Sequence, residues 1–128
     1  MNSNQPSERK KMALYIHGSI RSRMLIPRLL QSVGWNAVIT TDEENFLEQA
    51  QQLLPDAIIF DDVQAVTQLD HCRRLKTDKR TNHISVIIIS YSQEITQEKV
   101  TEAGASICLT APIDIDEFAA IFETDLFA

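Results

Sequence analysis

The sequence lacks the features that define several protein classes. Its two cysteines, Cys72 and Cys108, are too few for the disulfide framework of a small secreted domain or for a metal site. No apolar run approaches the roughly 18 residues that a bilayer-spanning helix requires. Residues 1–11 are polar and contain no apolar run, so they lack the core of a signal peptide. We therefore expect a cytoplasmic protein with a flexible leader at residues 1–11 and one domain at residues 12–128.

Positive charge is also scarce. The chain of 128 residues has 12 Lys and Arg against 18 Asp and Glu, which gives a formal net charge of −6. No basic stripe offsets this balance, so we expect neither a nucleic acid nor a membrane as a partner. His17, His71 and His83 do not have the spacing of zinc ligands, and we expect no metal and no cofactor.

What the sequence does contain is a regular alternation of short apolar runs and helical patterns. The runs suit buried strands because they are apolar throughout, as in a sheet covered on both faces. Five strand–helix repeats with short connections predict an α/β fold, a doubly wound flavodoxin-like sandwich with a five-stranded parallel sheet in the order 2-1-3-4-5. The expected strands are 13–16, 37–40, 57–60, 84–89 and 106–110.

The helix boundaries are predicted from capping residues and proline. Pro27 lies inside the first helical pattern and is expected to loosen its first turns, because proline removes a backbone hydrogen bond. Thr41 and Glu44 have the spacing of a capping box and predict the start of the second helix. Ser92 is expected to cap the fourth helix, which would run to Ala103.

Ligands of open α/β sheets bind beyond the carboxyl ends of the strands. Asp61 is expected at this edge, alone at the end of the apolar run Ala57–Phe60. The residues that the predicted strands deliver to the edge are His17-Gly18-Ser19, Thr40-Thr41, Asp61-Asp62, Ser90-Tyr91 and Thr110-Ala111-Pro112.

Several segments, in order and at nearly regular spacing, resemble the receiver domain of the CheY-like response-regulator family across residues 12–122. Pro55–Asp61 resembles the strand that carries the phospho-accepting aspartate. Cys72–Lys76 and Arg80–Ser90 resemble the third helix, its linker and the fourth strand. Glu102–Ala105 and Leu109–Pro112 resemble the approach to the fifth strand and the loop after it.

The resemblance assigns Asp61 to the phosphorylated position and Ser90 to the hydroxyl that contacts the phosphoryl group. The two acidic metal ligands of the family fall on His17 and Gly18, and its lysine falls on Ala111. The same comparison implies a cis peptide bond between Ala111 and Pro112. Together these positions form a vestigial pocket, which comprises His17, Gly18, Asp62, Ser90, Ala111 and Pro112.

These replacements affect the ability of the chain to accept a phosphoryl group, because phosphoryl transfer depends on positioning and on electrostatic stabilisation of the transferred group. Mg²⁺ is usually held by carboxylates together with substrate oxygens, and Asp61 alone is a poor substitute for three converging carboxylates. We therefore predict that Asp61 is not phosphorylated and is a solvated strand-end residue that caps nearby backbone amides. Cys108, at the family's aromatic switch position, is interpreted as a packing residue.

The leading functional prediction is a stand-alone pseudo-receiver without enzymatic activity, which signals by phosphorylation-independent protein–protein contact. Its partner would be another signalling protein or a second copy of the chain. By resemblance, the contact face would comprise the fourth helix, fifth strand and fifth helix, with Ile95, Lys99, Glu102, Cys108, Glu117, Ile121 and Phe122.

Two alternatives remain open. The first is an atypical response regulator of a two-component phosphorelay that accepts a phosphoryl group at Asp61. The second is a sensor that binds a small ligand in the vacated pocket around His17, Gly18, Asp61 and Ala111.

Overall fold

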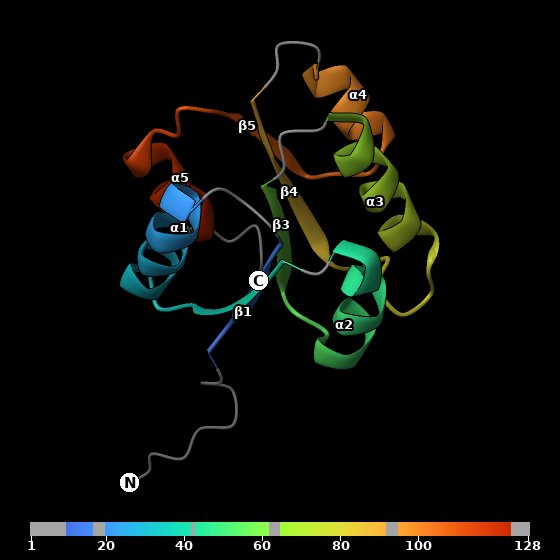
Figure 1. Ribbon diagram of the computed structural model, residues 1–128, viewed down its shortest axis with the longest axis horizontal. Coiled ribbons are helices and arrows are strands. Elements are labelled where there is room, and N and C mark those ends of the chain that lie inside the picture. The colour runs from blue at the N-terminus through green and yellow to red at the C-terminus, as the bar shows by residue number, and fades with distance from the viewer. Residues whose placement is uncertain (1–9, 17–19, 42, 62–64, 92–94, 124–128) are drawn as a thin grey trace, which may run out of the picture.

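A computed structural model describes residues 10–16, 20–41, 43–61, 65–91 and 95–123 (Figure 1). Five parallel strands form one sheet in the order β2-β1-β3-β4-β5, which confirms the predicted flavodoxin-like topology. The strands are β1 (Met12–Ile16), β2 (Asn36–Thr40), β3 (Ala57–Asp61), β4 (Ser85–Ser90) and β5 (Ile107–Thr110).

Helices cover both faces of this sheet. Figure 1 shows α1 and α5 together on one side and α2, α3 and α4 on the other. None of the helices within the described ranges has the length and apolarity that crossing a membrane requires. The helices are α1 (Ile20–Ser32), α2 (Phe46–Leu53, preceded by the 3-10 turn η2, Glu43–Asn45), α3 (Ala65–Thr77), α4 (Gln97–Glu102) and α5 (Ile115–Glu123).

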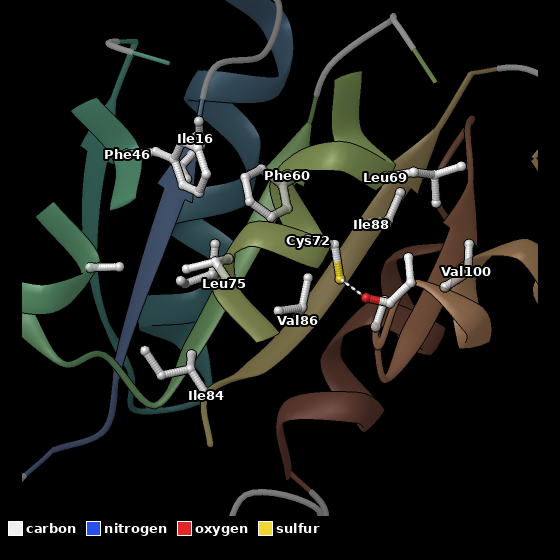
Figure 2. Packing of buried hydrophobic residues seen from close by; sticks show 14 of the residues in the cluster. Ile16, Phe46, Phe60, Leu69, Cys72, Leu75, Ile84, Val86, Ile88 and Val100 are labelled. Atoms are coloured by element: carbon white, nitrogen blue, oxygen red, sulfur yellow. Dashed lines mark hydrogen bonds between the residues drawn. The ribbon is translucent and has the colours of Figure 1, made fainter. Parts of the chain in front are cut away.

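The face under α2, α3 and α4 is a continuous apolar core (Figure 2). Phe60 of β3 is 1% exposed and meets Phe46 of α2 edge to face, with ring centroids 5.7 Å apart. The Cys72 thiol of α3 lies 3.2 Å from the Ala103 carbonyl oxygen and donates its weak hydrogen bond there. Packing of this kind stabilises the sheet through burial of apolar surface and close contact.

The face under α1 and α5 has a second core of similar composition. Trp35 is 4% exposed, packs against the Phe122 ring at a centroid distance of 5.1 Å, and donates its indole N–H to the Phe122 carbonyl oxygen at 3.1 Å. Side chains alternate between the two faces along each strand. Tyr15 and Ile59 therefore belong to this face, whereas Ile16 and Phe60 belong to the other.

Two predicted helix starts differ from the structure. The second α-helix begins at Phe46, and not directly after the predicted Thr41–Glu44 capping box. Its cap residue is Asn45, and the Asn45 side chain forms no cap hydrogen bond. The fourth helix begins at Gln97, where the Thr96 hydroxyl accepts a hydrogen bond from the Lys99 amide at 3.2 Å; Ser92 lies outside the described residues. The first helix continues through Pro27.

Candidate functional site at the carboxyl edge of the sheet

Asp61 is the last residue of β3 and lies at the edge where all five parallel strands end. It pairs in register with Ile89 of β4. Because side chains alternate along a strand, Asp61 shares the α1/α5 face with Ile59. The residue is only 1% exposed, so our prediction of a solvated strand-end carboxylate is wrong.

Two tyrosine hydroxyls hold this buried carboxylate. The Tyr15 hydroxyl donates to Oδ2 of Asp61 in a short hydrogen bond, and the Tyr91 hydroxyl donates to Oδ1 at 2.6 Å. Hydrogen bonds to a charged oxygen are shorter and stronger than neutral ones. The chain contains only two tyrosines, and both converge on the same side chain. We call Tyr15, Asp61 and Tyr91 the tyrosine–aspartate cluster.

The carboxylate changes the acid–base properties of both tyrosines. Burial first, and then the hydrogen bond and the charge of Asp61, hold the pKa of Tyr15 well above its ordinary value. The same two leading causes, burial and the hydrogen bond to Asp61, raise the pKa of Tyr91 to about 12. Both hydroxyls therefore keep their protons at neutral pH and remain donors to Asp61.

Ser22 of α1 extends the cluster toward the surface. Its Oγ lies 3.2 Å from the Tyr91 hydroxyl oxygen. The single proton of Tyr91 is directed to Asp61, so Ser22 is the donor in this pair. The hydrogen bonds thus run in one direction, from Ser22 to Tyr91 to Asp61.

Gln68 of α3 closes the opposite side of this edge. Its Nε2 donates to the Ile89 carbonyl oxygen at 2.9 Å and to the Phe60 carbonyl oxygen at 3.3 Å. The side chain is 1% exposed, and its Oε1 has no hydrogen-bond partner among the described residues. Gln68 therefore ties the ends of β3 and β4 together immediately before the cluster.

The remaining residues of the predicted pocket are only partly described. The peptide bond between Ala111 and Pro112 is cis, which confirms that prediction. Ser90 is buried, and its carbonyl oxygen accepts a hydrogen bond from the Ala111 amide at 2.8 Å. His17, Gly18 and Asp62 lie outside the described residues.

The predicted contact face is accessible only in part. Lys99, Glu102 and Glu117 are exposed, and Cys108 and Ile121 are half-buried. Ile95 is 9% and Phe122 is 4% exposed, since both pack into the cores. A partner would therefore contact the three charged residues and the edges of the two half-buried ones, without reaching Ile95 or Phe122.

Cys108 has the surroundings of a packing residue. It lies against the apolar core under α2, α3 and α4, and burial raises the pKa of its thiol. Burial likewise raises the pKa of Cys72 to about 11. Because the thiolate is the reactive form, both thiols are unreactive near neutral pH.

Comparison with solved structures agrees with this architecture. No protein-family model and no curated protein matches the sequence. Solved receiver domains do match. One is the receiver domain of a sensor histidine kinase from Pseudomonas aeruginosa, whose structure has Mg²⁺ coordinated in the active-site cleft. It superimposes with a TM-score of 0.76 at 18% identity, and the match covers 89% of this chain and 95% of that one. The fold is that of a receiver domain.

Two further neighbours are of the same type. The chemotaxis response regulator CheY4 of Vibrio cholerae gives a TM-score of 0.77 at 17% identity and covers 89% of this chain and 97% of its own. The receiver domain of a modulated diguanylate cyclase from Desulfovibrio desulfuricans gives 0.74 at 19% identity, with coverages of 89% and 91%. Identities this low establish a shared architecture.

The described residues do not fit the Mg²⁺ site of such a domain. Mg²⁺ takes oxygen ligands in near-octahedral geometry, usually including carboxylates. Here each oxygen of Asp61 already accepts a tyrosine hydrogen bond. Within the described ranges, no group of three or more His, Cys, Asp or Glu side chains could hold a metal ion.

Three residues of this site were missed by the sequence prediction, namely Tyr15, Ser22 and Gln68, and Tyr91 was placed at this edge without a role. A signal for the tyrosines was present, because Tyr15 precedes the end of a predicted strand and Tyr91 follows another. Parallel strands bring those ends to one edge. No pattern indicated Ser22 or Gln68, which approach from helices whose rotation about their axes is set by packing.

Proposed function

We propose that this chain is a pseudo-receiver: a response-regulator-like module that acts in signal transduction through protein contacts and does not accept a phosphoryl group at Asp61. The observation that carries the proposal is the tyrosine–aspartate cluster. An acceptor carboxylate must present an oxygen in line with the phosphorus atom. Asp61 is 1% exposed and both of its oxygens accept tyrosine hydrogen bonds.

Electrostatics supports the same proposal. The transferred phosphoryl group carries negative charge, which catalysts stabilise with metal ions, lysine or arginine. Ala111, at the position that the resemblance assigns to the lysine, has no charge to offer. An approaching phosphate would instead meet Tyr91, which is 43% exposed and whose hydroxyl proton is already donated to Asp61.

A direct test is to incubate the protein with Mg²⁺ and acetyl phosphate and to measure the intact mass. We expect no mass increase in the wild-type chain. The double variant Tyr15→Phe/Tyr91→Phe, which frees both oxygens, tests whether the tyrosines themselves block the reaction, and Asp61→Asn is the matched control. A phosphoryl adduct on the wild-type chain that Asp61→Asn abolishes would establish the phosphorelay alternative instead.

The proposed contacts use the accessible part of the face formed by α4, β5 and α5. Lys99, Glu102 and Glu117 supply exposed charges there, and Cys108 and Ile121 are half-buried. Non-obligate interfaces combine apolar area with polar and charged residues at their rim, and this face offers both kinds of residue. The partner is another signalling protein or a second copy of this chain.

Self-association is the contact that can be measured without knowing another partner. Sedimentation velocity over a concentration series should show a dimer that the charge reversal Glu117→Lys weakens. Glu48→Lys is the control, because Glu48 is exposed on α2, which is not part of the α4–β5–α5 face. A dimer that is unaffected by Glu117→Lys would place the interface elsewhere.

A further inference from the structure

A cavity of about 660 Å³ lies beside the tyrosine–aspartate cluster. One wall is formed by Ser22, Leu25 and Ile26 of α1. Tyr91 and residues 111–113, which connect β5 to α5, form the rest. Pockets of about 300–1,000 Å³ are typical of small-molecule sites, so the volume suits a small organic ligand.

Among the described residues that line the cavity, no side chain is charged. Leu25, Ile26 and residues 111–113 are apolar, and of these described residues Ser22 and Tyr91 carry the polar side-chain atoms. An ionised ligand would lose water here without gaining a counter-charge, which is costly. The negative charge of Asp61, one hydrogen bond behind Tyr91, makes an anion still less favourable.

The direction of its hydrogen bond to Asp61 defines what Tyr91 can recognise. The Tyr91 hydroxyl donates its single proton to Asp61, and its oxygen can still accept. Toward the cavity, Tyr91 therefore acts as an acceptor, so a complementary ligand must bring a donor.

We propose that this cavity binds an uncharged small molecule with an apolar body and one N–H or O–H donor, which Tyr91 accepts. The site differs from the vacated phosphorylation pocket, since among the described residues it includes Ala111 and Pro112 but not Ser90 or Asp61, and it reaches Asp61 through Tyr91. The proposal does not rest on the protein contacts proposed above, because no residue of the α4–β5–α5 face lines the cavity.

Three probes of nearly equal size test the proposal on the intact chain: indole, 1-methylindole and indole-2-carboxylate. The first has the donor, the second lacks it, and the third is an anion. Titrations followed by NMR should show indole shifting the resonances of Leu25, Ile26 and Ile113. We expect 1-methylindole to bind about tenfold more weakly, the value of one hydrogen bond, and indole-2-carboxylate to leave these resonances unmoved.

Variants separate the hydrogen bond from the cavity itself. Tyr91→Phe should weaken the binding of indole about tenfold and leave the affinity for 1-methylindole unchanged. Ala111→Leu, which fills the cavity, should abolish the shifts by both ligands. Ile39→Ala is the matched control, because Ile39 is an exposed residue of β2 at the far edge of the sheet, and it should change neither affinity.

Three results would overturn the proposal. Equal affinities for indole and 1-methylindole would remove the role of Tyr91 as acceptor. Shifts spread over the whole surface would indicate unspecific association. Absence of any indole binding, together with concentration-dependent self-association that Leu25→Glu abolishes, would show that a second copy of the chain occupies the cavity.

Discussion

The two faces of the sheet are built from similar apolar side chains but differ in what they hold at the carboxyl edge. The face under α2, α3 and α4 is apolar as far as Phe60. There the Gln68 side chain donates hydrogen bonds to the carbonyl oxygens of Phe60 and Ile89. The face under α1 and α5 ends in a buried carboxylate with two tyrosine donors. The difference shows that one face serves stability, whereas the other combines packing with a polar site and a cavity.

Truncation on the apolar face should have the largest effect. Phe60→Ala removes a ring that is 1% exposed, and such substitutions cost about 3–5 kcal/mol of unfolding free energy. Urea unfolding followed by the fluorescence of Trp35, the only tryptophan, measures this. Ile39→Ala, at a side chain that is 46% exposed, should change stability by less than about 0.5 kcal/mol. Equal losses in the two variants would contradict the assignment of the core.

Tyr15→Phe should have the next largest effect, and it acts on the other face. The substitution leaves Oδ2 of the buried Asp61 without its donor, at a cost of about 2 kcal/mol. Tyr91→Phe should cost less, about 1 kcal/mol or below, because Tyr91 is 43% exposed and water can replace its hydroxyl. The same urea experiment compares the two variants. A larger loss for Tyr91→Phe would mean that the outer tyrosine, and not the buried one, holds the carboxylate.

Gln68→Met should cost about 1 kcal/mol, less than Tyr15→Phe. The substitution loses two donors to strand carbonyls, but it also removes the Oε1 atom that is buried without a partner. Removal of an unsatisfied polar atom offsets part of the lost hydrogen bonding. Hydrogen exchange of the amides of residues 85–91 gives a local measure, and faster exchange there is expected. Unchanged protection would refute the role of Gln68 at this edge.

The stability of the folded chain should also depend on pH in the alkaline range. A tyrosine whose pKa is higher in the folded chain keeps its proton longer when folded, so its contribution is full below the unfolded pKa. For Tyr91 that contribution should be lost as the pH rises from 10 toward about 12. Tyr15 should extend the loss to higher pH, because its pKa is also raised.

Tyrosinate absorbance in the near ultraviolet tests the raised pKa of the two tyrosines directly, since the cluster contains every tyrosine of the chain. The folded protein should titrate above pH 10, and Tyr91→Phe should remove the earlier of the two steps. The unfolded chain in concentrated urea is the control and should titrate near pH 10, the ordinary value. A folded chain that titrates as the unfolded one does would contradict the hydrogen bonds to Asp61.

The fold could be predicted from the sequence because its signals are local. Apolar runs such as 57–60 and 84–89, separated by helical patterns, leave few topologies other than a doubly wound parallel sheet. Boundaries were less accurate: Thr41 has the spacing of a capping box, yet α2 begins at Phe46. Several residues near a helix start can act as its cap, and tertiary packing selects among them.

The position of the candidate site could be predicted from the sequence, but its chemical environment could not. The sequence by itself determined that Asp61 would stand at the carboxyl edge, because a strand end in a parallel sheet has only one position. Only the tertiary structure decided that Asp61 is buried under two tyrosines, since Tyr15 and Tyr91 are 46 and 30 residues away from it. Contacts over such separations depend on strand register and on the side chains that pack around them, and these are set when the sheet and its helices assemble.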